Sequence, residues 1–399
     1  MNFEITEEHR RLQQRCQVLA EDFATRAAAH DRDASHPSEN YAALRREGFY
    51  ALNVPQAMGG AGVGLLGHSL AFEALAQGCP GTALAFNMHL SIVGPLMESP
   101  EVSLATKKRV ADLVVKDPHL IAGNFSETSS TALLGAHTPE TRARRVDGGY
   151  RITGRKMFAS MLEAADYCAV FAYPDEATSP TAGLLVLVPR QAPGRRVDAV
   201  WDTLGMRATR SDSLILEDCW VPEEAVLLRT DDIRPFRQQG ANWLWGSYTA
   251  VYLGVGVAAY NEAIKVLKHR TPRGYTQPLA YHPDVRRQVA DMSVDVEAAR
   301  LMTYHAAWLS DTRGPTPETR AALYRAKYMV GEAVTRITRA ALTLGGAHAL
   351  FKTSPLERLF RDGAIAPMQF PPRDLCLSSL GALVFDLDPS DILPPLKRA

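Results

Sequence analysis

Cysteine is scarce in this chain of 399 residues: five cysteines occur, far apart, and none forms a Cys-x-x-Cys pair. A disulfide framework and a structural zinc site are therefore not expected, and a reduced, cytoplasmic compartment is favoured. An excess of either charge is also absent, because 44 Lys and Arg residues balance 44 Asp and Glu residues. That balance argues against nucleic acid or an anionic membrane as the main partner.

Long uncharged apolar runs are rare as well. Residues 1–8 are acidic and contain no apolar stretch, so no secretory signal is expected. The longest run, 243–260, reaches only about the 18–20 residues that a membrane span needs, and glycine and hydroxyl residues interrupt it. This run predicts a buried helix. With 46% hydrophobic residues, the chain has ample material for the cores of two or three domains.

The pattern of apolar residues changes twice along the chain. Residues 1–118 and 233–399 carry apolar residues at helical spacing, whereas 119–232 contain short β-branched or aromatic runs punctuated by glycine and proline. We therefore expect an α+β protein with an N-terminal helical domain, a middle antiparallel β-domain and a C-terminal helical domain. An Asp-Gly-Gly sequence at 147–149 predicts a hairpin turn, and Thr316 predicts a helix N-cap. The main C-terminal helices are expected over 251–269, 283–310, 316–344 and 356–365.

Six short motifs follow one another in a fixed order along nearly the whole chain. The most distinctive are Asn53-Val54-Pro55, the run 149–158, Leu204-Gly205-Met206-Arg207, Gly345-Gly346 and Arg361-Asp362. Together they resemble the signatures of the acyl-CoA dehydrogenase superfamily of flavoproteins. The resemblance implies a barrel-like middle domain and a C-terminal four-helix bundle. It also implies a flavin, FAD with FMN as the alternative, held between the β-domain and the C-terminal helices.

The resemblance assigns individual residues to that flavin. Phe158 stands where family members pack an aromatic side chain on the flavin ring, and Ser160 stands where a hydroxyl bonds flavin N5. An aromatic ring beside a hydroxyl suits stacking and fixes the reactive nitrogen. Phe125 and Ser126 are expected on the strand beside the pyrimidine end. Basic residues and glycines complete the predicted cofactor-binding set: Arg270, Arg273, His282, Gly345 and Gly346. The two arginines are expected at the flavin diphosphate.

Each of these assignments has a structural alternative that the sequence leaves open. Phe158 and Ser160 also suit ordinary strand packing, and the basic cluster at 268–273 also suits a solvated helix end. The segment 128–133 departs from the family, because hydroxyl residues replace a glycine-rich turn that lets the backbone approach the flavin.

The catalytic glutamate of the family is not found at the position that the resemblance indicates. Counting from Arg361-Asp362, Phe370 occupies that position, and the second position used in the family falls at Leu244 and Trp245. A phenyl ring cannot accept a proton, so the catalytic base is unknown. The residues considered in its place are Asp374, Glu127, His89, His282 and His348. Each also has a structural interpretation, such as a helix N-cap for Asp374.

Bulky aromatic residues are expected around the substrate. The resemblance places Trp245, Tyr248 and Phe370 in the substrate pocket, although an aromatic stripe of this kind also suits a helix core.

Three functions remain open at this point. The first is a flavin-dependent oxidoreductase that oxidises an acyl thioester, CoA-bound or carrier-bound, with a non-standard base. The second is a flavin-dependent monooxygenase or N-oxygenase on the same fold. The third is a flavin-free, non-catalytic homologue. The resemblance further implies a homodimer or homotetramer formed through the C-terminal helices. From the cysteine spacing, the charge balance and the apolar runs, no metal, nucleic acid or membrane is expected as a partner.

Overall fold

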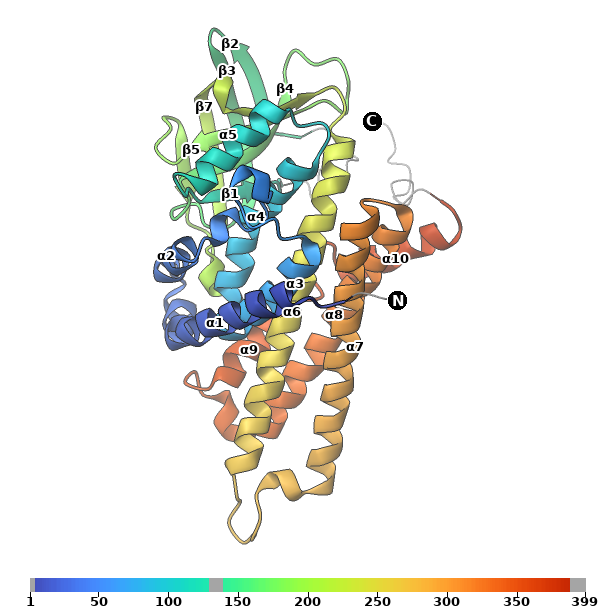
Figure 1. Ribbon diagram of the computed structural model, residues 1–399. Helices are drawn as coiled ribbons and strands as arrows, with labels where there is room; N and C mark the ends of the chain where they lie inside the picture. The colour runs from blue at the N-terminus through green and yellow to red at the C-terminus, as the bar shows by residue number, and fades with distance from the viewer. Residues whose placement is uncertain (1–3, 129–138, 388–399) are drawn as a thin grey trace, which may run out of the picture.

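The computed structural model describes residues 4–128 and 139–387 and shows the expected order of helices, sheet and helices (Figure 1). In Figure 1 the strands gather at one end of the molecule, and three long C-terminal helices, α6, α7 and α8, run away from them. The segment 128–133, expected as a hydroxyl-rich turn, lies almost wholly outside the described residues.

Five α-helices make up the N-terminal region of the described chain. The first begins after Thr6, whose hydroxyl accepts a hydrogen bond from the backbone N–H of His9 at 3.2 Å. The third and fourth are apolar on all sides and almost fully buried, as expected for helices enclosed by other elements. The bounds are α1 Glu7–Asp33, α2 Ser38–Arg46, α3 Leu65–Gly78, α4 Pro80–Glu98 and α5 Leu104–Val115.

Eight strands form one mixed sheet in the described residues, in the order β6-β7-β3-β2-β4-β5-β8, with β1 paired to β4. The predicted turn at 147–149 is confirmed, because Gly148, at φ +72°, joins β2 to β3. Most pairings are antiparallel as expected, but β1 and β2 each run parallel to β4, which local patterns could not reveal. The bounds are β1 Ile121–Asn124, β2 Arg142–Val146, β3 Gly149–Ala159, β4 Tyr167–Pro174, β5 Gly183–Pro189, β6 Arg195–Asp198, β7 Asp212–Pro222 and β8 Val226–Thr230.

Five α-helices follow in the described part of the C-terminal region. The predicted N-cap at Thr316 is confirmed, since its hydroxyl accepts a hydrogen bond from the N–H of Thr319 at 3.2 Å. The N-cap prediction for Asp374 is wrong: Pro372 is the N-cap, and Asp374 lies in the first helical turn. The bounds are α6 Arg234–His269, α7 Pro283–Arg313, α8 Pro317–Gly345, α9 Pro355–Ala364 and α10 Arg373–Val384.

Helix α6 is the longest of the described helices and begins at Arg234, before both the apolar run at 243–260 and the helix expected over 251–269. Nearly all its residues from Asn242 to Ala259 are buried, which confirms the buried helix predicted over 243–260. By length and composition α6 could cross a membrane, but 67% of its apolar window is buried inside the protein. Its apolar surface on all sides is therefore explained by neighbouring helices and by the sheet.

Two of the sequence motifs meet at the junction of all three regions. Arg361 on α9 donates hydrogen bonds to the Asp31 carboxylate of α1 and to the carbonyl of Leu204. The adjacent Asp362 accepts a hydrogen bond from the N–H of Met206 at 2.6 Å. Gly205 lies between these contacts, and a Cβ there would stand 2.3 Å from the carbonyl oxygen of Arg361. Only glycine fits this approach, so the loop that follows β6 is fixed against the C-terminal helices.

Candidate functional site

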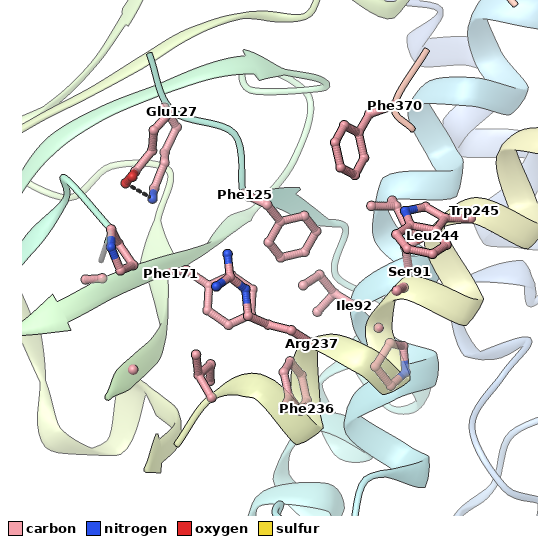
Figure 2. A pocket seen from close by; sticks show the side chains of 18 residues that line it. Ser91, Ile92, Phe125, Glu127, Phe171, Phe236, Arg237, Leu244, Trp245 and Phe370 are labelled. Atoms are coloured by element: carbon pink, nitrogen blue, oxygen red, sulfur yellow. Dashed lines mark hydrogen bonds and ion pairs between the residues drawn. The ribbon is translucent and has the colours of Figure 1, made fainter. Parts of the chain in front are cut away.

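A largely apolar cavity lies between α4, α6 and the sheet (Figure 2). Helix α6 lines one side with residues at helical spacing, and α4 contributes a short stretch. Figure 2 shows Phe125, Phe171 and Phe370 pointing into this space from different parts of the chain. The α6 residues that line it are Phe236, Arg237, Gly240, Ala241, Leu244 and Trp245.

One buried ion pair forms part of the cavity wall. Lys156 of β3 lies 2.5 Å from the carboxylate of Glu127, and both side chains are almost fully buried. That carboxylate also accepts hydrogen bonds from the backbone N–H groups of Glu140 and Thr141, at 2.7 and 3.0 Å. Burial raises the pKa of Glu127, but the charge and hydrogen bond of Lys156 outweigh it and hold the pKa below its usual value. Burial lowers the pKa of Lys156 to about 8, against the opposing effect of Glu127.

Glu127 is therefore a carboxylate whose oxygens are already occupied. Glu127 lines the cavity, as a catalytic base would have to do. However, each of its two carboxylate oxygens already accepts at least one hydrogen bond, from Lys156 or from the backbone. A general base must be free to receive the substrate proton. The geometry of Glu127 is that of a structural anion that anchors β3.

Of the three aromatic residues expected around the substrate, two line the cavity and one does not. Trp245 and Phe370 line the cavity together, with ring centroids 6.3 Å apart, and Trp245 packs on Tyr324 at 5.0 Å. Tyr248 is buried one turn further along α6 and is not among the cavity-lining residues described. Its hydroxyl lies 3.7 Å from the sulfur of Met88. Trp245 and Phe370 thus lie together in one part of the cavity wall, where the resemblance places the two alternative base positions of the family.

The end of strand β3 carries the two residues assigned to the flavin ring. Phe158 is 63% exposed, and its φ of +52° turns it out of the regular strand. It meets Trp201 edge to face, with centroids 6.3 Å apart. Val200 and Leu204, which flank Trp201 in sequence, are also more than half exposed. Such an apolar surface suits a planar ring system laid on it.

Ser160 begins a chain of three hydroxyl groups. Its Oγ lies 2.7 Å from Ser211 Oγ, Ser211 donates to Thr209 Oγ1 at 2.8 Å, and Thr209 donates to the carbonyl of Met206 at 2.9 Å. A carbonyl can only accept, so each hydroxyl in turn must donate toward it. Ser160 therefore donates to Ser211, and the lone pairs of its oxygen remain as acceptors.

The residues assigned to the diphosphate lie near the far end of α6. Arg270 donates a hydrogen bond to the carbonyl of Gly345 at 2.9 Å, which joins the end of α6 to the end of α8. Gly346 has φ +64°, and a Cβ there would lie 2.8 Å from the Arg270 guanidinium. Arg273 is exposed, and the exposed His282 caps α7 by accepting a hydrogen bond from the N–H of Asp284. Arg270 and the glycines are thus brought together, whereas Arg273 and His282 stand on the connecting loop.

The other residues considered as the base lie away from the cavity or are fully hydrogen-bonded. Asp374 is 90% exposed and pairs with Arg373. His348 is exposed in the turn after α8. The ring of His89 is buried, with Nδ1 accepting from the N–H of Ile121 and Nε2 facing the carbonyl of Tyr50. Burial lowers the pKa of His89 to about 4, so this ring is neutral and structural.

Two cavity residues have no role in the sequence-based assignments. Arg237 of α6 and Ser91 of α4 line the space from opposite helices. The sequence carries one signal for Arg237, because no charged residue follows it until Glu262. That pattern alone did not indicate a cavity, since the partner wall comes from the distant β-domain.

The arrangement fits a flavin by its chemistry. An exposed aromatic ring on β3, a hydroxyl directly after that strand, and an arginine beside paired glycines offer a stacking surface, a polar contact and a diphosphate contact. In the described ranges no group of three His, Cys, Asp or Glu side chains could hold a metal ion.

Comparisons with known proteins agree with this geometry. Models described as the N-terminal, middle and C-terminal domains of acyl-CoA dehydrogenase match residues 6–100, 124–219 and 242–368. YdbM of Bacillus subtilis, whose name assigns it to the acyl-CoA dehydrogenases, is 30% identical over 372 residues, which cover 92% of this chain and 95% of YdbM. The short-chain specific acyl-CoA dehydrogenase of Rattus norvegicus is 28% identical, over 91% of this chain and 86% of that protein.

Solved structures extend the comparison to the fold. Glutaryl-CoA dehydrogenase in complex with glutaryl-CoA superposes with a TM-score of 0.87, at 24% identity over 98% of each chain. KijD3 in complex with FMN and a dTDP-linked amino sugar gives a TM-score of 0.85, at 25% identity over 97% of this chain and 96% of that one. FMN-bound TdsC gives 0.85 at 21% identity, over 94% of this chain and 97% of that one. With three consecutive domain models matched, the chain belongs to the acyl-CoA dehydrogenase family of flavoproteins.

Proposed function

We propose that this protein is a flavin-dependent oxidoreductase that binds an acyl thioester, CoA-bound or carrier-bound, in the cavity between α4, α6 and the sheet. The observation that carries the proposal is the position of strand β3. Its residue Lys156 lines the cavity, and two positions further along the same strand Phe158 presents an exposed ring. One strand therefore connects the substrate space with the surface suited to a flavin.

The residues of this chain would hold the cofactor, FAD or FMN, in a defined way. Phe158 would cover one face of the ring system, the Ser160 oxygen would accept a hydrogen bond from the N5–H group of the reduced flavin, and Arg270 would meet the phosphate groups. A bound flavin supplies the acceptor for a hydride from the substrate. The protein would orient the substrate and exclude water, because the apolar side chains around Trp245 and Phe370 keep water from the reacting carbon.

A second candidate, a flavin-dependent monooxygenase, is favoured by one specific observation. Among the described residues that line the cavity, Glu127 is the only carboxylate, and it is held by Lys156 and two backbone N–H groups. No histidine lines it in the same ranges. Dehydrogenation of an acyl thioester requires a base for the α-proton, whereas oxygenation does not. The first function thus depends on a non-standard base.

One experiment distinguishes the two functions. Flavin-loaded protein is mixed with octanoyl-CoA without oxygen, and the visible absorbance of the flavin is followed. Bleaching by the thioester alone supports the dehydrogenase. Absence of bleaching, together with substrate-dependent oxygen uptake after chemical reduction, supports the monooxygenase instead.

Replacing Ser160 by alanine tests the assignment of the flavin ring. We expect Ser160→Ala to weaken the binding of reduced flavin about 2- to 10-fold, the effect of one net hydrogen bond. Anaerobic titration with reduced FAD and reduced FMN, followed by the quenching of tryptophan fluorescence, measures the two affinities. Ser179→Ala, which removes a hydroxyl bonded only within its own loop to Thr181, serves as the control. Equal affinity of Ser160→Ala and wild type for both flavins would remove Ser160 from the site.

We also infer a homodimer or homotetramer in the cytoplasm. Exposed apolar side chains support association through the C-terminal region, with Val294 and Leu301 on α7 and Val384 and Phe385 at the end of α10 all at least half exposed. The five free, buried cysteines suit a reducing compartment.

A further inference from the structure

Arg237 is a cation in the cavity wall without a partner in the described part of the chain. It stands in the first turns of α6, and its side chain makes neither a hydrogen bond nor an ion pair with any residue in 4–128 or 139–387. Figure 2 shows its side chain extending into the space beside Phe171 and Phe236. Burial lowers the pKa of Arg237, against a weaker opposing effect of Glu127.

The charges around the cavity do not cancel. Its charged lining residues are Lys156, Arg237 and Glu127. Lys156 and Glu127 form a direct pair at 2.5 Å, so each neutralises the other. One positive charge, that of Arg237, remains facing an apolar space, where a charged group is unfavourable unless an anion joins it.

Ser91 offers a second unpartnered polar group in the same cavity. Its residue is 3% exposed, and its Oγ has no hydrogen-bond partner among the described residues. Buried hydroxyl groups are normally hydrogen-bonded, so an orphaned one at a cavity wall indicates a place for a ligand atom. Ser91 belongs to α4, and Figure 2 shows it beside Leu244 and Trp245, on the other side of the space from the Arg237 guanidinium, so it would meet a different part of a bound ligand.

The spacing along α6 sets the distance between this cation and the part of the cavity wall formed by Trp245 and Phe370. Arg237 and Trp245 are separated by two helical turns on one face, with Gly240, Ala241 and Leu244 between them. At 1.5 Å per residue this is about 12 Å along the helix axis. The two intervening small residues, Gly240 and Ala241, leave room for a chain to pass.

We propose that this cavity selects acyl groups that carry a carboxylate, which the Arg237 guanidinium binds. The proposal rests on the thioester binding proposed above and names its substrate class. A guanidinium offers parallel N–H donors that match the two oxygens of a carboxylate, which a lysine ammonium cannot do in the same way. Arg237 is thus a residue that determines specificity, at a distance from the reacting carbon.

The test compares matched pairs of ligands by calorimetry on the full chain. Suberyl-CoA and octanoyl-CoA have equally long acyl groups and differ by one terminal carboxylate, and free suberate probes the carboxylate contact without a thioester. The variants are Arg237→Gln and Arg237→Lys. Arg234→Gln is the matched control, because Arg234 lies on the same helix, is exposed and pairs with Asp232. Circular dichroism establishes that each variant folds.

We expect suberyl-CoA to bind wild type at least 10-fold more tightly than octanoyl-CoA, as a charged hydrogen bond implies. Arg237→Gln should abolish this preference, Arg237→Lys should retain part of it, and Arg234→Gln should leave it unchanged. Equal binding of the two thioesters to wild type, or a preference that survives Arg237→Gln, would overturn the carboxylate site and leave the thioester proposal standing. If free suberate binds wild type but not Arg237→Gln, and neither thioester binds, the proposed thioester binding would be refuted and the carboxylate site would stand. Binding of no probe would refute both.

Discussion

Replacing Glu127 by alanine is expected to lower the free energy of unfolding by about 3–5 kcal/mol, the usual effect of removing one partner of a buried ion pair. The physical reason is the position of Lys156, whose ammonium would lose the carboxylate 2.5 Å away while remaining almost fully buried. The backbone N–H groups of Glu140 and Thr141 would lose their acceptor as well. Urea unfolding followed by circular dichroism measures the loss.

Two control variants test whether the loss of stability comes from the unpaired buried charge. The double variant Glu127→Leu with Lys156→Met removes both charges and should recover a large part of the loss, because the uncompensated ammonium is gone. Glu217→Ala removes the partner of Arg196 in an exposed pair and should change stability by no more than about 0.5 kcal/mol. A loss for Glu127→Ala as small as that for Glu217→Ala would contradict the structural role of the pair.

Introducing a carboxylate at Phe370, in the cavity wall beside Trp245, should create or strongly accelerate dehydrogenation. We expect Phe370→Glu to raise the rate of anaerobic flavin bleaching by octanoyl-CoA about 10²- to 10⁴-fold, the usual contribution of a general base. The apolar surroundings, which include Trp245 with its ring 6.3 Å from that of Phe370, would raise the pKa of the new carboxyl toward neutrality.

Phe370→Gln is the control for shape and polarity, since an amide fills similar space but does not act as a base. It should leave the rate at the wild-type value. A wild-type protein that already bleaches as fast as Phe370→Glu would show that a base exists elsewhere. A Phe370→Glu rate no higher than that of Phe370→Gln would show that the position does not face the reacting carbon.

Local sequence signals predicted the features that depend on a few neighbouring residues. The turn at 147–149 needed a glycine with positive φ, and the N-cap at Thr316 needed a hydroxyl before a helix. Motif order predicted the family. The motif at 204–207 and the Arg361-Asp362 motif occur together because they contact each other: the Gly205 backbone approaches that of Arg361, and the Arg361 side chain donates to the carbonyl of Leu204.

Features that depend on distant contacts were missed. The parallel pairings of β1 and β2 with β4 join segments that no local pattern connects. The start of α6 at Arg234 was missed because glycine and aromatic residues weaken the local helix preference, while burial against other elements outweighs it. Arg237 and Ser91 become cavity-lining residues only when the β-domain packs over the two helices, and no local pattern reveals that packing.

The central claim is that the surface around Phe158 and Ser160 holds a flavin, and one spectrum tests it most directly. The purified chain is incubated with FAD and, separately, with FMN, passed through a desalting column, and its visible absorbance is recorded. We predict that one of the two flavins remains bound in near-stoichiometric amount. Protein that leaves the column without flavin absorbance after both incubations would contradict the claim, and with it both proposed functions.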